Sequence, residues 1–242
     1  MCSLEKRGRI WILTLGGDDE HRLSPDVLDS IKSALDRIRS ESSSGSALVT
    51  TSTGKFFSNG FDLAWARSGP SSAASFQQRL NLMVDKHRSI VASLVSLPMP
   101  TIAAITGHAA AGAFMLALAH DYIVMRRDRG FLYMSELDIG LPFVDYMMAL
   151  IRAKSPSPAV LRDIVLRSRR FTAGEALDAR IIQVAAADSG EAVAEAVRLA
   201  EDLAGRGWDG KVYASIRTAA FPELAGGLGL VIGIAKKTTS RL

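Results

Sequence analysis

The sequence predicts an α/β fold in which strands and helices alternate, and three observations support it. Short apolar runs rich in β-branched residues recur along residues 1–188, with helix start signals between them. The region 189–242 is rich in alanine and predicts helices. With 242 residues, of which 48% are hydrophobic and 22% charged, the chain can bury a full core as one domain. Repeated β-β-α units would wind residues 1–188 into a spiral core, followed by a helical C-terminal region over 189–242.

The expected strands are short and apolar. They lie at Ile10–Leu15, Ala47–Thr51, Thr101–Thr106, Tyr122–Arg126 and Phe131–Met134. The segments 53–60 and 68–75 are expected to be loops, and the second is rich in Ser, Gly and Pro. We expect segment 68–75 to form a mobile, variable wall of a pocket.

Start signals mark most of the expected helices. Ser24-Pro25 supplies an N-cap and a first-turn proline for a helix to about Arg39, and a longer helix is expected over Phe76–Leu97. The later signals are Ser157-Pro158, the capping box Thr172–Glu175, and Ser189 before an alanine-rich stretch to Arg206.

The segment Pro100–Asp121 joins an apolar strand to an apolar helix through a turn of glycine and alanine. Its uncharged run has the length of a membrane span, but Gly107 and His108 interrupt it, so we expect no span. A bare backbone beside a helix start suits the binding of an anion. A buried strand-loop-helix unit without chemistry is the alternative from the residues alone.

Composition and motifs exclude several classes of function. The net charge is +4 and the basic residues are scattered, which argues against a nucleic-acid surface. Cys2 is the lone cysteine, so no internal disulfide or cysteine metal cage can form. The four histidines lie on separate predicted elements, and phosphate-loop, dinucleotide and nucleophile-elbow motifs are missing. We therefore expect no metal and no nucleophile-and-base enzyme, and we interpret His120-Asp121 as a structural pair at a helix end.

The chain closes with Ser240-Arg241-Leu242, a variant of the Ser-Lys-Leu peroxisomal address. This tripeptide predicts a peroxisomal location and a peroxisomal import receptor as a partner.

Three segments together resemble the enoyl-CoA hydratase/isomerase (crotonase) family. Gly54–Leu63, GKFFSNGFDL, resembles the G-K-x-F-S-x-G-x-D-L loop of that family, and Gly107–Asp121 matches its glycine-rich segment at the same length. Phe131–Pro142 matches the segment with the catalytic carboxylate, and Phe171–Leu177 resembles a late helix before a final strand. The resemblance implies a spiral of β-β-α turns and a tail that supports a homotrimer or hexamer.

The resemblance also implies an active site for an acyl-CoA substrate, with coenzyme A as part of the substrate and no separate cofactor. The backbone N–H groups of Phe61 and Gly112 would hold the oxygen of a thioester enolate, although each residue could instead serve packing alone. Glu136 would be the acid/base, with the nearby Asp138 as its rival, and Lys55 would meet the phosphates or adenine of coenzyme A. The other implied substrate-binding residues are Asp62, Leu63, Ala109, Met115, Leu141 and Phe143.

The reaction type follows from the carboxylates that the resemblance implies. Family hydratases use two glutamates, and here the first position is Met115 while the second is Glu136. A single glutamate can move a proton from the α to the γ carbon, which implies a Δ3,Δ2-enoyl-CoA isomerase, similar to plant peroxisomal ones. The alternatives are a hydratase or other enolate-forming CoA enzyme, and a non-catalytic acyl-CoA-binding protein.

Overall fold

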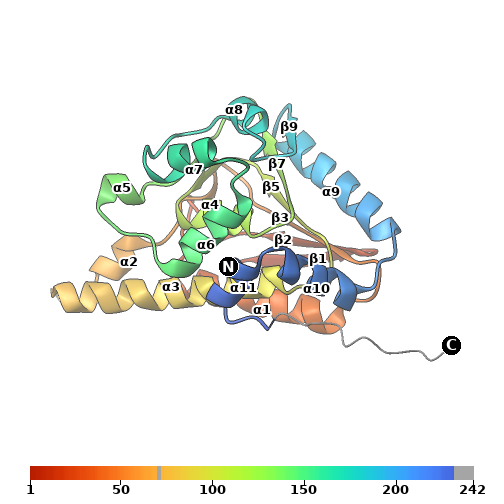
Figure 1. The fold of residues 1–242 in the computed structure, drawn as a ribbon, viewed down its shortest axis with the longest axis horizontal. Helices are drawn as coiled ribbons and strands as arrows, with labels where there is room; N and C mark the ends of the chain where they lie inside the picture. Colours follow the sequence, from red (N-terminus) through yellow and green to blue (C-terminus); the bar gives the residue numbers. More distant parts are fainter. Residues whose placement is uncertain (70–71, 232–242) are drawn as a thin grey trace.

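A six-stranded sheet forms the centre of the molecule in the computed structural model, which describes residues 1–69 and 72–231 (Figure 1). Its strand order is β1-β2-β3-β5-β7-β9, with β1 antiparallel to β2 and every other pair parallel. The strands are β1 (Ser3–Arg7), β2 (Ile10–Thr14), β3 (Ala47–Thr51), β5 (Thr101–Ile105), β7 (Tyr122–Arg126) and β9 (Val184–Ala186). The expected strands at Ala47–Thr51 and Tyr122–Arg126 are confirmed with the same bounds, whereas β1 was not anticipated.

A second, three-stranded parallel sheet has the order β4-β6-β8. It consists of β4 (Phe56–Ser58), β6 (His108–Ala110) and β8 (Leu132–Tyr133). Each of these short strands directly follows a strand of the main sheet along the chain, and a helix comes next. The predicted spiral of β-β-α units is therefore confirmed. Segment 53–60, expected to be a loop, contains β4. The sequence did not predict this strand, because three residues are too few to show a period-2 pattern.

Helices cover both faces of the main sheet. They are α1 (Pro25–Glu41), α2 (Leu63–Arg67), α3 (Ala73–Val95), α4 (Gly112–Leu118), α5 (Glu136–Ile139), α6 (Asp145–Lys154), α7 (Pro158–Val165), α8 (Ala173–Asp178), α9 (Ser189–Gly205), α10 (Gly210–Ala220) and α11 (Pro222–Gly227). The N-cap at Ser24 and the capping box of Thr172 and Glu175 are both present. Helix α3 begins three residues earlier than expected, because the Ser72 side chain accepts a bond from the Ser75 N–H and caps it.

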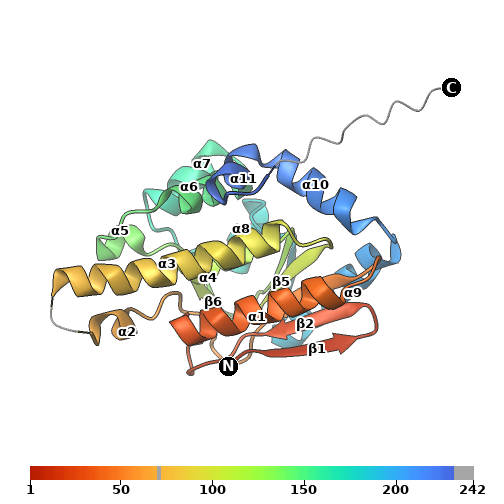
Figure 2. The same ribbon diagram turned by 90° about the horizontal axis from the view of Figure 1, so that it is seen from below.

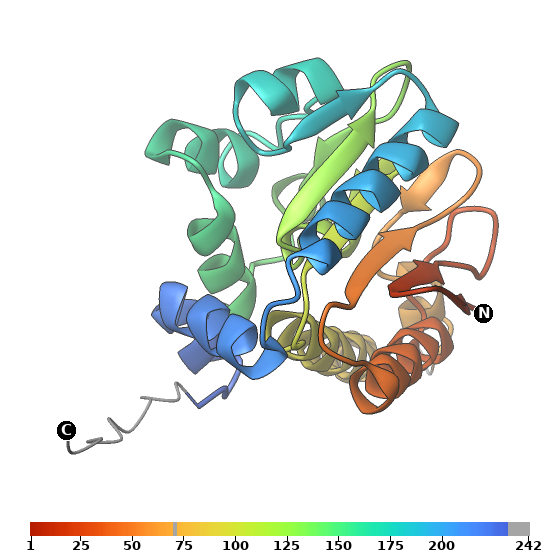
Figure 3. The same ribbon diagram turned by 90° about the vertical axis from the view of Figure 1, so that its right-hand side faces the viewer.

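The helices divide between the two faces of the sheet. Helix α9 lies along one face (Figure 3), where its alanines pack on the side chains of β3, β5 and β7. Helices α1 and α3 lie side by side (Figure 2), and their apolar faces share the larger core with α4 and α6. The division at residue 188 remains a prediction, and α9 is packed on the same sheet as the spiral.

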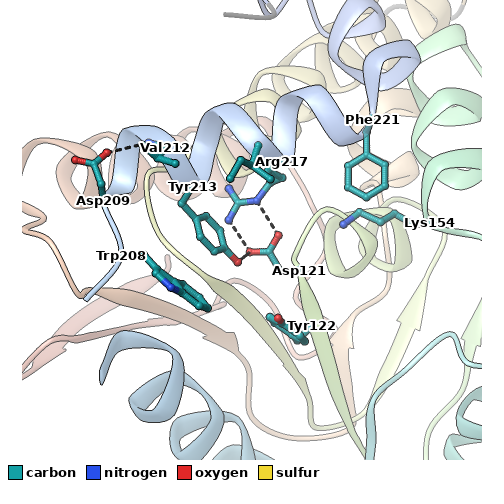
Figure 4. Close-up of a pocket in the computed structure, with 10 residues that line it drawn as sticks. Asp121, Tyr122, Lys154, Trp208, Asp209, Val212, Tyr213, Arg217 and Phe221 are labelled. Carbon is teal, nitrogen blue, oxygen red and sulfur yellow. Dashed lines mark hydrogen bonds and ion pairs between the residues drawn. The ribbon is translucent and has the colours of Figure 1, made fainter. Parts of the chain in front are cut away.

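Helix α10 is joined to the start of β7 by a buried ion pair. The Arg217 guanidinium donates to Asp121 through Nε at 2.7 Å (Figure 4). It also donates to the carbonyls of Leu97 and Met99. Asp121 also accepts from the Thr101 N–H, so β5, β7 and α10 meet at one carboxylate. His120 bonds instead to Thr50 and to the Leu116 carbonyl, so His120 and Asp121 are both structural but bind different partners.

Two further sequence expectations concern a membrane span and the C-terminal tripeptide. No helix among the described residues is long and apolar enough to cross a membrane. The tripeptide Ser240-Arg241-Leu242 lies outside the described residues.

Candidate active site

The three segments singled out in the sequence meet at one edge of the small sheet. Phe61 follows β4, Gly112 follows β6, and Glu136 follows β8. Because the three strands are parallel, their carboxyl ends lie at the same edge, which is where open α/β sheets place ligands. Segments far apart in the sequence are thus brought together by the spiral.

The loops at Phe61 and Gly112 are in close contact. A Cβ on Gly60 would stand 2.8 Å from the Ala110 carbonyl oxygen and 3.4 Å from the Gly112 nitrogen. The φ of Gly60 is +75°, a conformation that favours glycine. On the other side, a Cβ on Gly112 would lie 3.5 Å from the Phe61 ring. Gly60 therefore permits the close approach of the two loops, whereas a Cβ on Gly112 would make only ordinary van der Waals contact.

The geometry leaves two backbone N–H groups at this contact. Leu23 forms a parallel bridge with Phe61, donating to the Gly60 carbonyl at 2.8 Å and accepting from the Asp62 N–H at 3.4 Å. In such a bridge the N–H of the middle residue, Phe61, points away from Leu23. Gly112 is the first residue of α4, so its N–H has no partner within the helix.

Ala111, the N-cap of α4, has an unusual backbone conformation with φ 49° and ψ −118°. A non-glycine residue there is strained, and such strain clusters at functional sites. The Ala111 N–H donates to the Tyr133 carbonyl at 2.8 Å, and its carbonyl accepts from the Met115 N–H. These bonds hold the strained residue between β8 and α4.

A cavity of about 160 Å³ opens beside these loops. Among the described residues that line it, Glu136 is the one ionisable side chain, and the other linings are apolar groups, three amides and a serine. They are Asn59, Phe61, Leu63, Gln77, Leu80, Asn81, Val84, Ala111, Ser135, Ile139, Leu141, Pro142, Val144 and Met147. The cavity therefore combines one carboxyl group with a mostly apolar wall.

The Glu136 side chain has the properties of a general base. It is only 8% exposed, and its Oε2 atom has no hydrogen-bond partner among the described residues. Burial raises the pKa of its carboxyl above the usual range, although the backbone N–H groups of Glu136 and Ser135 oppose this shift. Asp138, the rival in the sequence, is exposed and does not line the cavity. The structure thus favours Glu136 over Asp138.

The other predicted site residues divide into two groups. Leu63 and Leu141 line the cavity with Phe61 and Glu136. Lys55, just before β4, is exposed, with its ammonium 5.4 Å from the centroid of the Phe56 ring. Asp62 caps α2 by accepting from the Trp65 N–H. Ala109 and Met115 are fully buried and Phe143 is half-buried, and none of the three lines the cavity.

Sequence reasoning assigned no role to His87, which lies directly behind the two loops. It is 0% exposed on α3, and its ring meets the Phe61 ring edge-on at 5.4 Å between centroids. The signal that could have found it is its position on the apolar face of a helix, between Met83 and Ile90. No cluster of three or more metal-ligating side chains occurs in the described ranges.

A buried carboxyl group lies at the same edge of a small parallel sheet as the Phe61 and Gly112 loops, on a spiral of β-β-α turns, and this is the arrangement that the resemblance to the crotonase class implies. The sequence profile of the enoyl-CoA hydratase/isomerase family matches residues 13–216. The chain belongs to the enoyl-CoA hydratase/isomerase family.

Relatives and solved structures agree with this membership. The chain is 53% identical to enoyl-CoA delta isomerase 2, peroxisomal, of Arabidopsis thaliana, over 95% of this chain and 96% of the relative. It is 52% identical to enoyl-CoA delta isomerase 1, peroxisomal, of the same plant, over 93% and 91%. The fold is similar to that of an enoyl-CoA hydratase from Mycobacterium marinum, with a TM-score of 0.82 at 20% identity, covering 94% of each chain.

Proposed function

We propose that this protein is a Δ3,Δ2-enoyl-CoA isomerase that moves the double bond of a 3-enoyl-CoA to give the trans-2-enoyl-CoA in fatty-acid oxidation. The observation that carries the proposal is the single ionisable side chain, Glu136, among the described residues lining the cavity. The membership of the family and the names of the Arabidopsis relatives support the same activity.

The reaction needs one group that both accepts and returns a proton. The Glu136 carboxylate takes a proton from the α carbon, and the electron pair of that C–H bond delocalises into the thioester carbonyl and the 3,4 double bond. The protonated Glu136 then returns the proton to the γ carbon, the 2,3 double bond forms, and the carbonyl is restored. Atoms and electrons balance without water or a redox partner.

The unpartnered Oε2 of Glu136 supports this role, because a base must be free to reach the substrate. Burial also helps. A carboxyl group whose pKa is raised by burial is a stronger base when ionised and remains available as an acid when protonated.

The enolate oxygen would bind the backbone N–H groups of Phe61 and Gly112. Rigid backbone donors aimed at a developing oxyanion contribute about a hundred- to a thousandfold in rate each. The closeness of Gly60 to the Gly112 nitrogen supports this pairing, and Phe61 and Ala111, the residue before Gly112, line the same cavity.

A hydratase would need a second acid to activate water, and the cavity offers none among its described lining residues. Met115, at the position where family hydratases have glutamate, is buried in the main core. A thioether cannot hold or polarise water as a carboxylate does. Isomerisation is therefore favoured over hydration.

The two Arabidopsis relatives are named as peroxisomal proteins. On this similarity, this protein is peroxisomal too. Recognition of Ser240-Arg241-Leu242 by an import receptor remains a prediction, as does contact of Lys55 with coenzyme A. Deleting the tripeptide from a fluorescent fusion checks the first, and we expect the label to move to the cytosol.

We further propose that the chain forms a trimer, or a hexamer of two trimers, through its C-terminal helices. Helix α10 supports this, because Val212 and Ile216 are 56% and 64% exposed and line an open groove together with Trp208. Figure 4 shows Val212 and Trp208 at this groove. Light scattering tests the proposal: we expect the mass of three or six chains for the wild type and of one chain for Ile216→Lys. A monomeric wild type would contradict it.

The isomerase activity itself is tested with 3-hexenoyl-CoA, whose product is conjugated and absorbs in the ultraviolet. We expect turnover by the wild type and no addition of water to trans-2-hexenoyl-CoA at a comparable rate. Hydration at a rate that rivals isomerisation would indicate a hydratase instead.

A further inference from the structure

A buried hydrogen-bonded chain runs from α6 through α3 to the first residue of α4. The Nε2 atom of His87 lies 2.9 Å from the Gly112 carbonyl oxygen, and its Nδ1 atom lies 2.9 Å from the Tyr146 hydroxyl. Both side chains are buried in the main core, and neither was assigned a role by the sequence. This series of hydrogen bonds ends at Gly112, one of the two residues proposed to hold the enolate oxygen.

The donors in this chain follow from its chemistry. A carbonyl oxygen can only accept, so Nε2 of His87 carries the proton and donates to Gly112. In the neutral ring Nδ1 then accepts, and the Tyr146 O–H donates to it. The Val84 carbonyl is a second, longer option for the Tyr146 hydroxyl at 3.4 Å. One arrangement of protons satisfies both close bonds.

His87 also contacts the other proposed donor residue. Its ring meets the Phe61 ring at 85° between planes, and a Cβ added at Gly112 would lie 3.5 Å from the same Phe61 ring. One imidazole therefore contacts the side chain of Phe61 and the carbonyl of Gly112. A displaced ring would change the position of both residues.

We propose that His87, oriented by Tyr146, is a positioning residue that holds the Gly112 and Phe61 amides in the geometry required by the enolate. The inference rests on the proposed function, because it assigns His87 to the oxyanion site of that reaction. His87 does not line the cavity and is not a catalytic residue. It acts through the carbonyl of Gly112, whose fixed direction limits rotation of the residue that supplies the N–H.

The expected effect is on the transition state more than on binding of the substrate. Donors gain their effect by being fixed before charge develops, and a misplacement of about 1 Å can lower a rate about a hundredfold. His87 does not line the cavity, so its loss removes no side chain that a bound acyl chain would contact there. Loss of His87 should therefore lower kcat and leave KM nearly unchanged.

His120, elsewhere in the same protein, is a matched control for His87. It is equally buried, and its two ring nitrogens also bond to a hydroxyl and a helix carbonyl, those of Thr50 and Leu116. It lies at the opposite end of α4, away from Gly112. A substitution of His120 should destabilise the protein in a similar way without changing the oxyanion site.

The test compares His87→Leu, His87→Gln, Tyr146→Phe and His120→Leu with the wild type. For 3-hexenoyl-CoA we expect His87→Leu to lower kcat about a hundredfold with KM within about threefold. His87→Gln keeps an N–H that can reach the Gly112 carbonyl, so its kcat should be about tenfold higher than that of His87→Leu. Tyr146→Phe should lower kcat by about threefold to tenfold, and His120→Leu should leave kcat within about twofold of the wild type.

A second measurement separates this inference from the proposed function. Acetoacetyl-CoA ionises readily at its α carbon, and its enolate has an ultraviolet band that reports binding. The wild type should bind it as the enolate, and His87→Leu should weaken that binding at least tenfold while binding hexanoyl-CoA as before. If the wild type binds the enolate but does not turn over 3-hexenoyl-CoA, the proposed function is contradicted. The role of His87 is then tested by the ultraviolet enolate absorbance of the His87 variants alone.

Either of two results would overturn the inference. One is a folded Tyr146→Phe or His87→Leu protein with wild-type kcat and wild-type enolate binding. The other is an equal loss of kcat in His120→Leu, which would assign the effect to general destabilisation. If His87→Leu does not fold, the Tyr146→Phe and His87→Gln variants decide, because both nearly preserve the volume of the buried side chain.

Discussion

Gly60 and Gly112 lie so close that a Cβ on Gly60 would stand 3.4 Å from the Gly112 nitrogen and only 2.8 Å from the Ala110 carbonyl oxygen. These residues come from loops that follow β4 and β6, and their contact defines the spacing of the two proposed enolate donors. The strands themselves are short. The precision of the site therefore depends on the absence of a side chain at Gly60.

The first prediction concerns this contact. Gly60→Ala should destabilise the fold by about 1–3 kcal/mol and lower kcat, because the new methyl group meets backbone and the φ of +75° is strained for alanine. Gly54→Ala is the control, since Gly54 has a similar φ of +80° but no atom within 4 Å of its added Cβ. Chemical denaturation and turnover of both variants check it. Equal kcat in the two would contradict a role for the close contact.

The second prediction concerns Ala111, whose φ of 49° is unfavourable for a residue with a Cβ. Ala111→Gly should raise the free energy of unfolding by about 1 kcal/mol, because glycine adopts this conformation without strain. Ala113→Gly, within the same helix, should lower it by about 1 kcal/mol or more. Urea denaturation of the pair gives the comparison, and a loss of stability in Ala111→Gly would show that the strain is small.

The third prediction concerns the stability cost of the proposed base. Since burial raises the pKa of Glu136 in the fold, its carboxyl favours folding below the unfolded pKa, and that contribution is lost as the pH rises through the folded pKa. Glu136→Gln should therefore be more stable than the wild type at pH 8 and not at pH 4. Melting temperatures at the two pH values check this, and Asp138→Asn, at an exposed position, is the control.

The fourth prediction concerns acid stability. Burial lowers the pKa of both His87 and His120 to about 4. Each therefore contributes stability that is present above the unfolded value near 6.5 and is lost as the pH falls toward 4, on the order of 3 kcal/mol per residue. His87→Gln should reduce this loss between pH 7 and pH 4. An unchanged pH dependence of unfolding in this variant would contradict a buried neutral imidazole.

The sequence predicted the long elements of this fold and one short strand, since β8 lies within the expected strand Phe131–Met134, but it did not predict β4 or β6. Strands β3 and β7 and the capped helices α1 and α8 carry strong local signals, such as β-branched runs and the Thr172 capping box. Strands β4, β6 and β8 have two or three residues each, so their pairing depends on the neighbouring turns of the spiral. Their arrangement could not be predicted from local pattern alone.

The candidate site shows the same division. Glu136, Phe61 and Gly112 were predicted by resemblance, and the structure brings their segments to one edge of the small sheet. His87 and Tyr146 were not predicted, because they act from α3 and α6 and no motif joins them. The contact of His87 with Gly112 spans 25 positions in the sequence, and only the fold, which brings α3 to the first residue of α4, reveals it.

The most direct test of the central claim is the isomerisation of 3-hexenoyl-CoA by the wild type and by Glu136→Gln. If Glu136 is the sole acid/base, the wild type should form the conjugated product, and the variant should lose at least about a thousandfold in kcat while still binding the substrate. In the wild type, kcat should rise with pH through the raised pKa of Glu136. Unaltered turnover by Glu136→Gln would contradict the account.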